Sequence, residues 1–211
     1  RVKSIPYKIL SSEEVEKHKH VITHHVGKIV KHNGEVSSSD VEDLSSSDEE
    51  NDQKQPMISK FKQLIREIDS VYELFKDWDT RKEKLQQILE RSDLTTRSVN
   101  KYTHWDLSKS YTRNLCHSTD EYTLLILCWS PSKESKIHNH PSQSCFIKTL
   151  RGCIREVVYV PDETDNLVPV RTRFYNEGQV SWMSDSIGLH KIGNPCPESG
   201  SVTLHLYTPP F

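Results

Sequence analysis

The sequence lacks the features of a membrane protein or a nucleic-acid-binding protein. No apolar run approaches the roughly 20 residues that a helix needs to cross a bilayer. Neither sign of charge predominates, because 28 lysines and arginines stand against 30 aspartates and glutamates, for a formal net charge of -2. A nucleic-acid-binding protein usually shows a basic face. We therefore expect neither a membrane nor a nucleic acid as a partner.

Cysteines are few, and they do not form recognisable pairs. Their number is odd and no C-x-x-C occurs, which fits neither a disulfide framework nor a structural zinc site. We expect a reducing, cytoplasmic setting in which a cysteine is by default a small buried hydrophobic residue. The five are Cys116, Cys128, Cys145, Cys153 and Cys196.

Residues 1–56 differ in composition from the rest of the chain. Five histidines are scattered among lysines in residues 1–36, and residues 37–52 are nearly all serine and acid. Such a segment cannot bury enough apolar surface to offset its chain entropy, so we predict a disordered N-terminal extension. A metal-binding histidine tract is the alternative, which the irregular spacing disfavours.

Two helices are expected at the start of an ordered domain over 57–211. Thr80-x-x-Glu83 has the pattern of a capping box and predicts a helix over 80–91. Before it, apolar residues at spacings of three and four predict one buried face of a helix over 58–75: Ile58, Phe61, Ile65, Ile68 and Tyr72.

From about Tyr122 onward, the pattern changes to short apolar segments separated by Pro, Gly, Asn and Asp. Many short strands at regular intervals indicate an all-β sandwich or barrel. We therefore predict a mainly β domain with a helical cap. The predicted strands are 122–129, 145–150, 153–160, 171–175, 179–183 and 202–207.

His138-Asn-His140 is the first motif that points to chemistry. Residues two apart in an extended strand point to the same side, so the two imidazoles could share a metal. An H-x-H pair alone is common, and two ordinary histidines remain the alternative. The pair gains weight from two later segments of the chain, namely Gly152 and then Gly188-Leu189-His190.

These segments resemble the two-part motif of the cupins, which implies a jelly-roll β-barrel. The motif supplies two histidines, an acidic residue and a glycine, and later a third histidine and an asparagine, here Asn194. The acidic position is Cys145, so three neutral histidines would bind the metal without a carboxylate. Imidazole suits several metals, including iron. A substrate thiolate would restore the missing negative charge and favour Fe(II).

The resemblance to the animal-type cysteine dioxygenases is closer still and runs from about residue 74 to the last residue. It implies Fe(II) bound by His138, His140 and His190, and the conversion of L-cysteine and O2 to cysteine sulfinic acid. The matching segments, in order, are Tyr111–Leu115, Ile126–Trp129, Ile137–His140, Cys145-Phe146, Asp185–His190 and Leu204–Phe211.

The same resemblance implies roles for four further residues. Arg113 would bind the substrate carboxylate, a task suited to a bidentate guanidinium. Tyr207 would donate a hydrogen bond in the cavity, with His205 holding it, and Cys145 would form a thioether crosslink with Tyr207. Thr203, where the family usually has serine, would extend the hydrogen-bonded series of Tyr207 and His205. Without the resemblance, Arg113 would be taken for a solvated charge in a loop, and His205 and Tyr207 for ordinary half-buried polar residues.

Two other functions remain open. The enzyme could oxidise another small thiol, such as 3-mercaptopropionate or cysteamine, although cysteamine has no carboxylate for Arg113. The chain could also be a cupin that only binds a metal, which the fold permits but which would need neither Arg113 nor Tyr207. Family members continue beyond the segment that ends at Phe211, so we expect the natural chain to be longer. No coiled coil is evident, and we expect a monomer.

Overall fold

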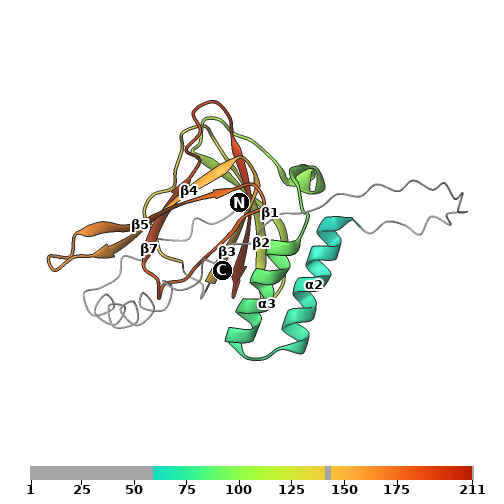
Figure 1. The fold of residues 1–211 in the computed structure, drawn as a ribbon. Helices are drawn as coiled ribbons and strands as arrows, with labels where there is room; N and C mark the ends of the chain where they lie inside the picture. The colour runs from blue at the N-terminus through green and yellow to red at the C-terminus, as the bar shows by residue number, and fades with distance from the viewer. Residues whose placement is uncertain (1–58, 141–143, 211) are drawn as a thin grey trace, which may run out of the picture.

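The structure, a computed structural model, describes residues 59–140 and 144–210. The predicted disordered extension, residues 1–56, lies outside the described residues. None of the helices within the described ranges is long and apolar enough to cross a lipid bilayer. Figure 1 shows two α-helices packed beside a body of β-strands. The helical elements are α2 (Lys60–Leu74), α3 (Trp78–Arg91) and the 3-10 helix η1 (Thr96–Tyr102).

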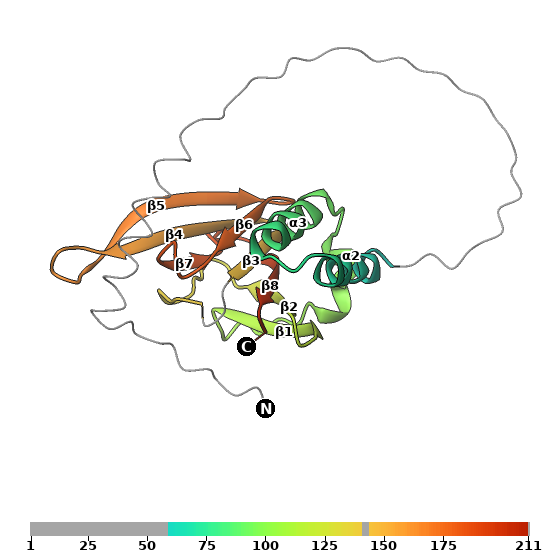
Figure 2. The same cartoon turned by 90° about the horizontal axis from the view of Figure 1, so that it is seen from below.

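Two antiparallel sheets form the body of the domain, as expected for a jelly-roll barrel. The five-stranded sheet has the order β1-β2-β8-β3-β6 and the three-stranded sheet the order β5-β4-β7 (Figure 2). The last strand therefore lies in the middle of the larger sheet. The strands are β1 (Tyr111–Ser118), β2 (Thr123–Trp129), β3 (Ser144–Arg151), β4 (Cys153–Pro161), β5 (Leu167–Asn176), β6 (Val180–Met183), β7 (Leu189–Gly193) and β8 (Ser201–Thr208).

The two helices begin at side chains that cap their first turns. Ser59 accepts a hydrogen bond from the backbone N–H of Lys62 in α2, and Asp77 accepts one of 2.8 Å from Thr80 in α3. The expected capping box at Thr80 is therefore wrong, because α3 begins at Trp78. A carboxylate is a strong N-cap and is favoured by the positive end of the helix dipole, so Asp77 starts the helix before Thr80 can.

The larger sheet is buried on both faces, and each face has its own core. All eight residues of β8 are buried. Alternate residues of β2, beginning with Leu124, pack with the buried face of α2 and α3, and the others, beginning with Leu125, face the inside of the barrel. A sheet covered on both faces has nearly continuous apolar strands, which explains the unbroken apolar run before Trp129. On α2 the buried residues are Phe61, Leu64, Ile68, Val71 and Tyr72.

Two strands were not predicted. β1 has exposed residues at Arg113, Leu115 and Ser118 because it is an edge strand of the larger sheet, and it lacks a clear alternation. β7 is only five residues long. β1 includes Arg113 and β7 includes His190, two of the residues that the sequence predicts for the site.

Candidate metal centre

Three histidines from two distant segments converge inside the barrel. Each of His138, His140 and His190 offers a ring nitrogen, and these ligand atoms all lie within 4.8 Å of one another. The ring centroids are 4.6–5.3 Å apart. The structure thus brings together the three residues that the sequence predicted as metal ligands.

His138 and His140 do not lie in a regular strand, contrary to the expectation from their spacing. His138 instead forms an isolated antiparallel bridge with His190, through backbone N···O distances of 2.9 and 3.0 Å. The backbone N–H of His140 donates to the Asp185 carboxylate at 2.9 Å. Pro141 comes next in the sequence and has no N–H to give to a strand ladder. Hydrogen bonds to His190 and Asp185, in the second motif, therefore hold this segment in place of a strand ladder.

Gly188 brings the start of β7 close to β4. Its φ of +130° lies in the region that favours glycine, and a Cβ added there would lie 2.7 Å from the carbonyl oxygen of Tyr159. β4 and β7 then pair from Tyr159 and Leu189 onward, with His190 opposite Val158. The glycine before the histidine therefore permits the close approach that seats His190.

Hydrogen bonds determine which ring nitrogens of the cluster are available. Nδ1 of His138 lies 2.9 Å from the carbonyl oxygen of Lys136, and Nδ1 of His190 lies 2.9 Å from Oε1 of Glu156. Both partners accept, so each Nδ1 carries the proton and each Nε2 keeps its lone pair. Within the described part of the chain, Nε2 of His190 and Nδ1 of His140 are buried and have no hydrogen-bond partner.

A metal ion fits this arrangement. Burial lowers the pKa of His138, and it lowers the pKa values of His140 and His190 well below the ordinary range for histidine. Neutral imidazole is the form that coordinates a metal. Buried polar atoms are normally satisfied, and a shared cation would satisfy the lone pairs that the protein leaves unpaired.

Cys145 and Tyr207 lie next to this cluster. They are paired residues of β3 and β8, and each side chain is close enough to affect the pKa of the other. The ring of Tyr207 is 6.1 Å, between centroids, from that of His140. Burial raises the pKa of the Cys145 thiol and of the Tyr207 phenol, so both keep their protons at neutral pH.

A buried chain of hydrogen bonds leads from Trp129 to Tyr207. Nε1 of Trp129 lies 2.9 Å from Oγ1 of Thr203, which lies 2.9 Å from Nε2 of His205. Nδ1 of His205 lies 3.3 Å from the Tyr207 hydroxyl and 3.7 Å from Sγ of Cys145. An indole can only donate, so the Thr203 hydroxyl accepts from it and can give its own proton to Nε2 of His205. Nδ1 of His205 then carries a proton on the side of Tyr207.

Arg113 lies at the exposed rim of the site, on β1 and not in a loop. Its Nη2 is 3.5 Å from the hydroxyl of Tyr111, and the guanidinium lies 5.5 Å from the centroid of that ring. The positive charge of Arg113 contributes to lowering the pKa values of His138, His140 and His205, after the larger effect of burial. Arg113 is therefore close enough to act electrostatically on the cluster.

Comparison with known proteins decides the family. Residues 51–211 match the family described as Cysteine dioxygenase type I. The chain belongs to this family. Curated relatives include cysteine dioxygenase type 1 of Homo sapiens, 34% identical over 161 residues, with 75% of this chain and 80% of the relative covered. The Rattus norvegicus protein of the same name is 35% identical over 144 residues, with 67% and 72% covered.

Among solved structures, the chain is similar to a double-stranded β-helix protein from Klebsiella pneumoniae, with a TM-score of 0.44. That pair is 14% identical and covers 56% of this chain and 86% of the other. The mainly β barrel expected from the cupin resemblance is confirmed, with short helices beside it.

Two residues that contact the candidate site, Glu156 beside His190 and Trp129 beside Thr203, had no role in the sequence predictions. Glu156 is a lone glutamate in an otherwise mainly apolar strand segment, which is the only sign of it in the sequence. Trp129 lies in a segment that matched the family but had no role assigned. Asn194, the asparagine of the second motif, instead supports a turn, because its Oδ1 accepts from the N–H of Cys196 at 2.9 Å and its Nδ2 donates to Ser199 at 2.7 Å.

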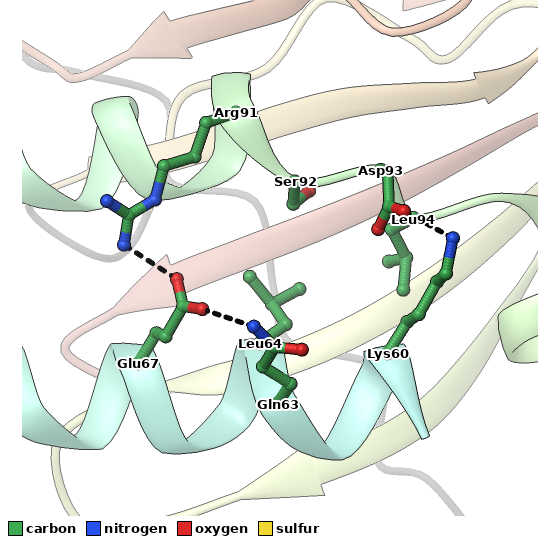
Figure 3. Close-up of a pocket in the computed structure, with 8 residues that line it drawn as sticks. All are labelled: Lys60, Gln63, Leu64, Glu67, Arg91, Ser92, Asp93 and Leu94. Atoms are coloured by element: carbon green, nitrogen blue, oxygen red, sulfur yellow. Dashed lines mark hydrogen bonds and ion pairs between the residues drawn. The ribbon is translucent and has the colours of Figure 1, made fainter. Parts of the chain in front are cut away.

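A surface pocket lies elsewhere, between the start of α2 and the end of α3 (Figure 3). Its charged side chains pair with one another, Arg91 with Glu67 at 2.8 Å and Lys60 with Asp93. None of its lining residues belongs to the histidine cluster or the Trp129–Tyr207 chain. We do not assign it a part in the chemistry.

Proposed function

We propose that this chain is a cysteine dioxygenase that converts L-cysteine and O2 to cysteine sulfinic acid. The convergence of three neutral histidines, two of which have a buried ring nitrogen without a hydrogen-bond partner in the described part of the chain, beside Tyr207, carries the proposal. Membership of the cysteine dioxygenase type I family supports it. A cupin that merely bound a metal would need no buried chain from Thr203 to Tyr207 and no arginine at the rim.

His138, His140 and His190 would hold Fe(II) in this proposal. Iron, when bound, supplies the redox chemistry by which O2 reacts with a thiol, which the surrounding side chains do not supply. The three ligands are neutral, so an anionic substrate is favoured beside them. A thiolate provides that charge and is a soft ligand of the kind that suits iron–sulfur bonding.

Arg113 would orient the substrate through its carboxylate. A guanidinium forms two parallel hydrogen bonds with a carboxylate, which sets direction as well as affinity. The position of Arg113 on the rim strand β1 lets it bind the carboxylate while the thiol end points inward to the histidines. The same contact disfavours cysteamine, which has no carboxylate.

Tyr207 would donate a hydrogen bond to the sulfur of the substrate, or to the oxygen being transferred. Its raised pKa keeps the proton on the phenol at neutral pH. His205 limits the rotation of that hydroxyl through the 3.3 Å contact of Nδ1, and Thr203 holds His205 on its other side. The Trp129 indole orients Thr203 in turn, so that His205 accepts at Nε2 and donates at Nδ1.

Cys145 and Tyr207 would become covalently joined during turnover. A bond forms between Sγ and the ring carbon beside the hydroxyl, and the S–H and C–H bonds break. The two hydrogens leave as two protons and two electrons, which reduce one molecule of O2, already the co-substrate, to hydrogen peroxide. The neighbouring positions of the two side chains across β3 and β8 support this step.

The compartment, the oligomeric state and the role of the extension are further parts of the proposal. All five cysteines are free in the structure, which supports a reducing, cytoplasmic location. We propose a monomer in which residues 1–56 take no part in catalysis, since the residues assigned to the chemistry all lie after residue 110.

Oxygen uptake by the iron-loaded, full-length protein tests the proposal and its competitors. The substrates compared are L-cysteine, 3-mercaptopropionate and cysteamine, with the sulfinate product quantified for each. We expect L-cysteine to give the largest kcat/KM and one O2 consumed per sulfinate formed. A preference for 3-mercaptopropionate would assign the second function, and no uptake with any thiol would leave a metal-binding cupin. Arg91→Ala, which removes a surface charge and its ion pair with Glu67 away from the histidine cluster, is the control and should behave as the unaltered protein.

A further inference from the structure

Glu156 is a buried carboxylate in direct contact with the histidine cluster. It lies on β4 with 1% of its surface exposed, and its Oε1 is 2.9 Å from Nδ1 of the fully buried His190. Val158, two residues further along β4, pairs with His190 on β7. Glu156 and Val158 therefore face the same side of the sheet, and the glutamate reaches His190 diagonally across the ladder.

The other oxygen of Glu156 is held from the opposite strand. The hydroxyl of Tyr175 donates to Oε2 at 3.2 Å, and Nη2 of Arg171 lies 3.8 Å from the same oxygen. Both residues are on β5, on the far side of β4 from β7. Burial raises the pKa of the Glu156 carboxyl, while the charge of Arg171 and the hydrogen bond of Tyr175 oppose that rise. Tyr175 and Arg171 are both donors, which matches the ionised carboxylate, since that form only accepts, and His190 then donates from Nδ1.

We propose that Glu156 is a positioning residue of the metal centre. It fixes the proton of His190 on Nδ1, aims the Nε2 lone pair into the cluster, and places one negative charge a single hydrogen bond from a neutral ligand set. The inference rests on the proposed metal site but not on the identity of the thiol. A carboxylate behind a ligating histidine also makes the imidazole more electron-rich.

The charge of Glu156 lies close to a ligand set that lacks a carboxylate, because Cys145 occupies the acidic position of the motif. With a cysteine where a cupin would carry an acidic ligand, the cluster has no carboxylate of its own. Glu156 supplies the charge from behind His190, where it takes up no coordination position. His138, by contrast, donates its Nδ1 proton to the neutral carbonyl of Lys136. His190 is therefore the ligand whose donor strength the protein adjusts.

A purely structural role is the competing explanation. In that case the carboxylate would serve only to tie β4 to β5 through Arg171 and Tyr175. Its removal would then weaken folding without changing the affinity of the folded protein for a metal. Metal affinity, measured on folded protein, separates the two roles.

The test compares Zn(II) binding by metal-free protein before and after Glu156→Gln, by competition with a chromophoric chelator. Zn(II) is redox-inert, so the result does not depend on dioxygenase activity. The amide keeps the shape and removes the charge. We expect the dissociation constant for Zn(II) to rise about 10- to 100-fold, the usual effect of losing such a partner. Unfolding of the metal-free variant is followed in parallel to establish that it is folded.

Asp69→Asn is the matched control. Asp69 also accepts a hydrogen bond from a tyrosine, the hydroxyl of Tyr122 at 2.7 Å, but it lies on α2 and outside the cluster. The same change from carboxylate to amide should leave Zn(II) affinity within about twofold, the scale of changes remote from a site. If Asp69→Asn and Glu156→Gln behave alike, the loss at Glu156 is not specific and the proposal is overturned.

Nuclear magnetic resonance of the Zn(II)-loaded protein provides a second readout. The Nδ1 proton of His190 should appear far downfield and exchange slowly, and in Glu156→Gln it should move upfield and exchange faster. Unchanged Zn(II) affinity together with an unchanged proton signal would overturn the proposal. If Glu156→Gln does not fold, Tyr175→Phe decides, because it removes the hydrogen bond to Oε2 and keeps the charge of Glu156 and its contact with Arg171. We expect it to weaken Zn(II) binding roughly two- to fivefold, and no change would overturn the proposal.

Failure of this inference is distinguishable from failure of the proposed function. A Zn(II) affinity that falls in Glu156→Gln, with no O2 uptake by the iron-loaded unaltered protein, would support the positioning role and reject the dioxygenase. Normal O2 uptake by the iron-loaded unaltered protein, with equal Zn(II) affinity in the unaltered protein and in Glu156→Gln, would support the dioxygenase and reject the positioning role.

Discussion

Cys145 and Tyr207 lie directly opposite each other on adjacent strands, β3 and β8, and each side chain is close enough to affect the pKa of the other. They are 62 positions apart in the sequence, yet the antiparallel register places them on the same inner face of the barrel. Paired residues of antiparallel strands have Cβ atoms about 4.5–5.5 Å apart. No large movement is needed for a bond between the sulfur and the ring.

The first prediction rests on this pairing. After repeated turnover with L-cysteine, part of the intact protein should lose the mass of two hydrogens, and peptide mapping should join the segments that contain Cys145 and Tyr207. Mass spectrometry of protein before and after turnover makes the measurement. Cys145→Ser should abolish the crosslinked species but only reduce activity, because the three histidines and Arg113 remain. If turnover leaves only unlinked peptides, the crosslink proposal is rejected while the metal site stands.

The second prediction concerns metal retention. His138→Ala should lose stoichiometric iron, because two imidazoles replace three and the remaining lone pairs no longer enclose an ion. Iron content after gel filtration, by elemental analysis, provides the measurement. His104→Ala is the control, since His104 lies outside the cluster. A His138→Ala protein that keeps one iron per chain and normal turnover would contradict the assignment of the ligands.

The third prediction concerns substrate binding. Arg113→Ala should raise KM for L-cysteine, because the carboxylate loses a charge-assisted contact. Such contacts contribute about 1.5–3 kcal/mol, which corresponds to roughly 10- to 150-fold in affinity. Steady-state O2 uptake over a range of cysteine concentrations measures it. Arg91→Ala is the control for loss of a surface arginine, and an unchanged KM in Arg113→Ala would place Arg113 outside the substrate site.

The fourth prediction concerns the hydrogen-bond chain. Thr203→Val keeps the shape but removes the hydroxyl, which leaves both Nε1 of Trp129 and Nε2 of His205 without a partner. Each buried unsatisfied group costs about 1–3 kcal/mol, so the free energy of unfolding should fall by at least that amount. We expect kcat to fall more than KM changes, because Tyr207 loses its orientation. Thr203→Ser restores the hydroxyl and should recover both the free energy of unfolding and kcat. Equal losses in Thr203→Val and Thr203→Ser would reject the proposed hydrogen-bond chain.

The fifth prediction concerns the N-terminal segment. Removal of residues 1–56 should leave kcat/KM for L-cysteine within about twofold, the scale of changes remote from a site. The residues assigned to the chemistry all lie in the remaining part of the chain. Parallel kinetics of the full-length and shortened proteins make the comparison. A large loss of kcat/KM would show that the segment contributes to the site, and the domain boundary would have to move.

The fold class could be read from the sequence where patterns are local. Strands such as β2 and β8 were predicted almost to their ends because two-sided burial makes them continuously apolar. β1 and β7 were missed, since an edge strand and a five-residue strand carry too few buried residues to show a pattern. The start of α3 was misplaced by two residues, because Asp77 and Thr80 are both acceptable caps and only the backbone geometry selects between them.

Some residues of the candidate site could likewise be identified from the sequence, and others only from the structure. The three histidines were identified from the order of the cupin-like motifs and from the resemblance to the cysteine dioxygenases, and Arg113, His205 and Tyr207 from that resemblance alone. The structure brings the histidines together as expected. Glu156 was not identified, because a single glutamate in a strand has no local sign of its partner. Its contact with His190 depends on the pairing of β4 with β7.

By itself, the sequence determined the types of groups available: three imidazoles without an acidic ligand, a cysteine in the acidic position, and a histidine and tyrosine two residues apart on a strand. Such information is local, because side-chain chemistry and the periodicity of a strand do not depend on the rest of the fold. Only the tertiary structure decided which ring nitrogens face the cluster, that Trp129 orients Thr203, and that Glu156 stands behind His190. Those facts depend on strand register between distant segments, which is set by the packing of the whole barrel.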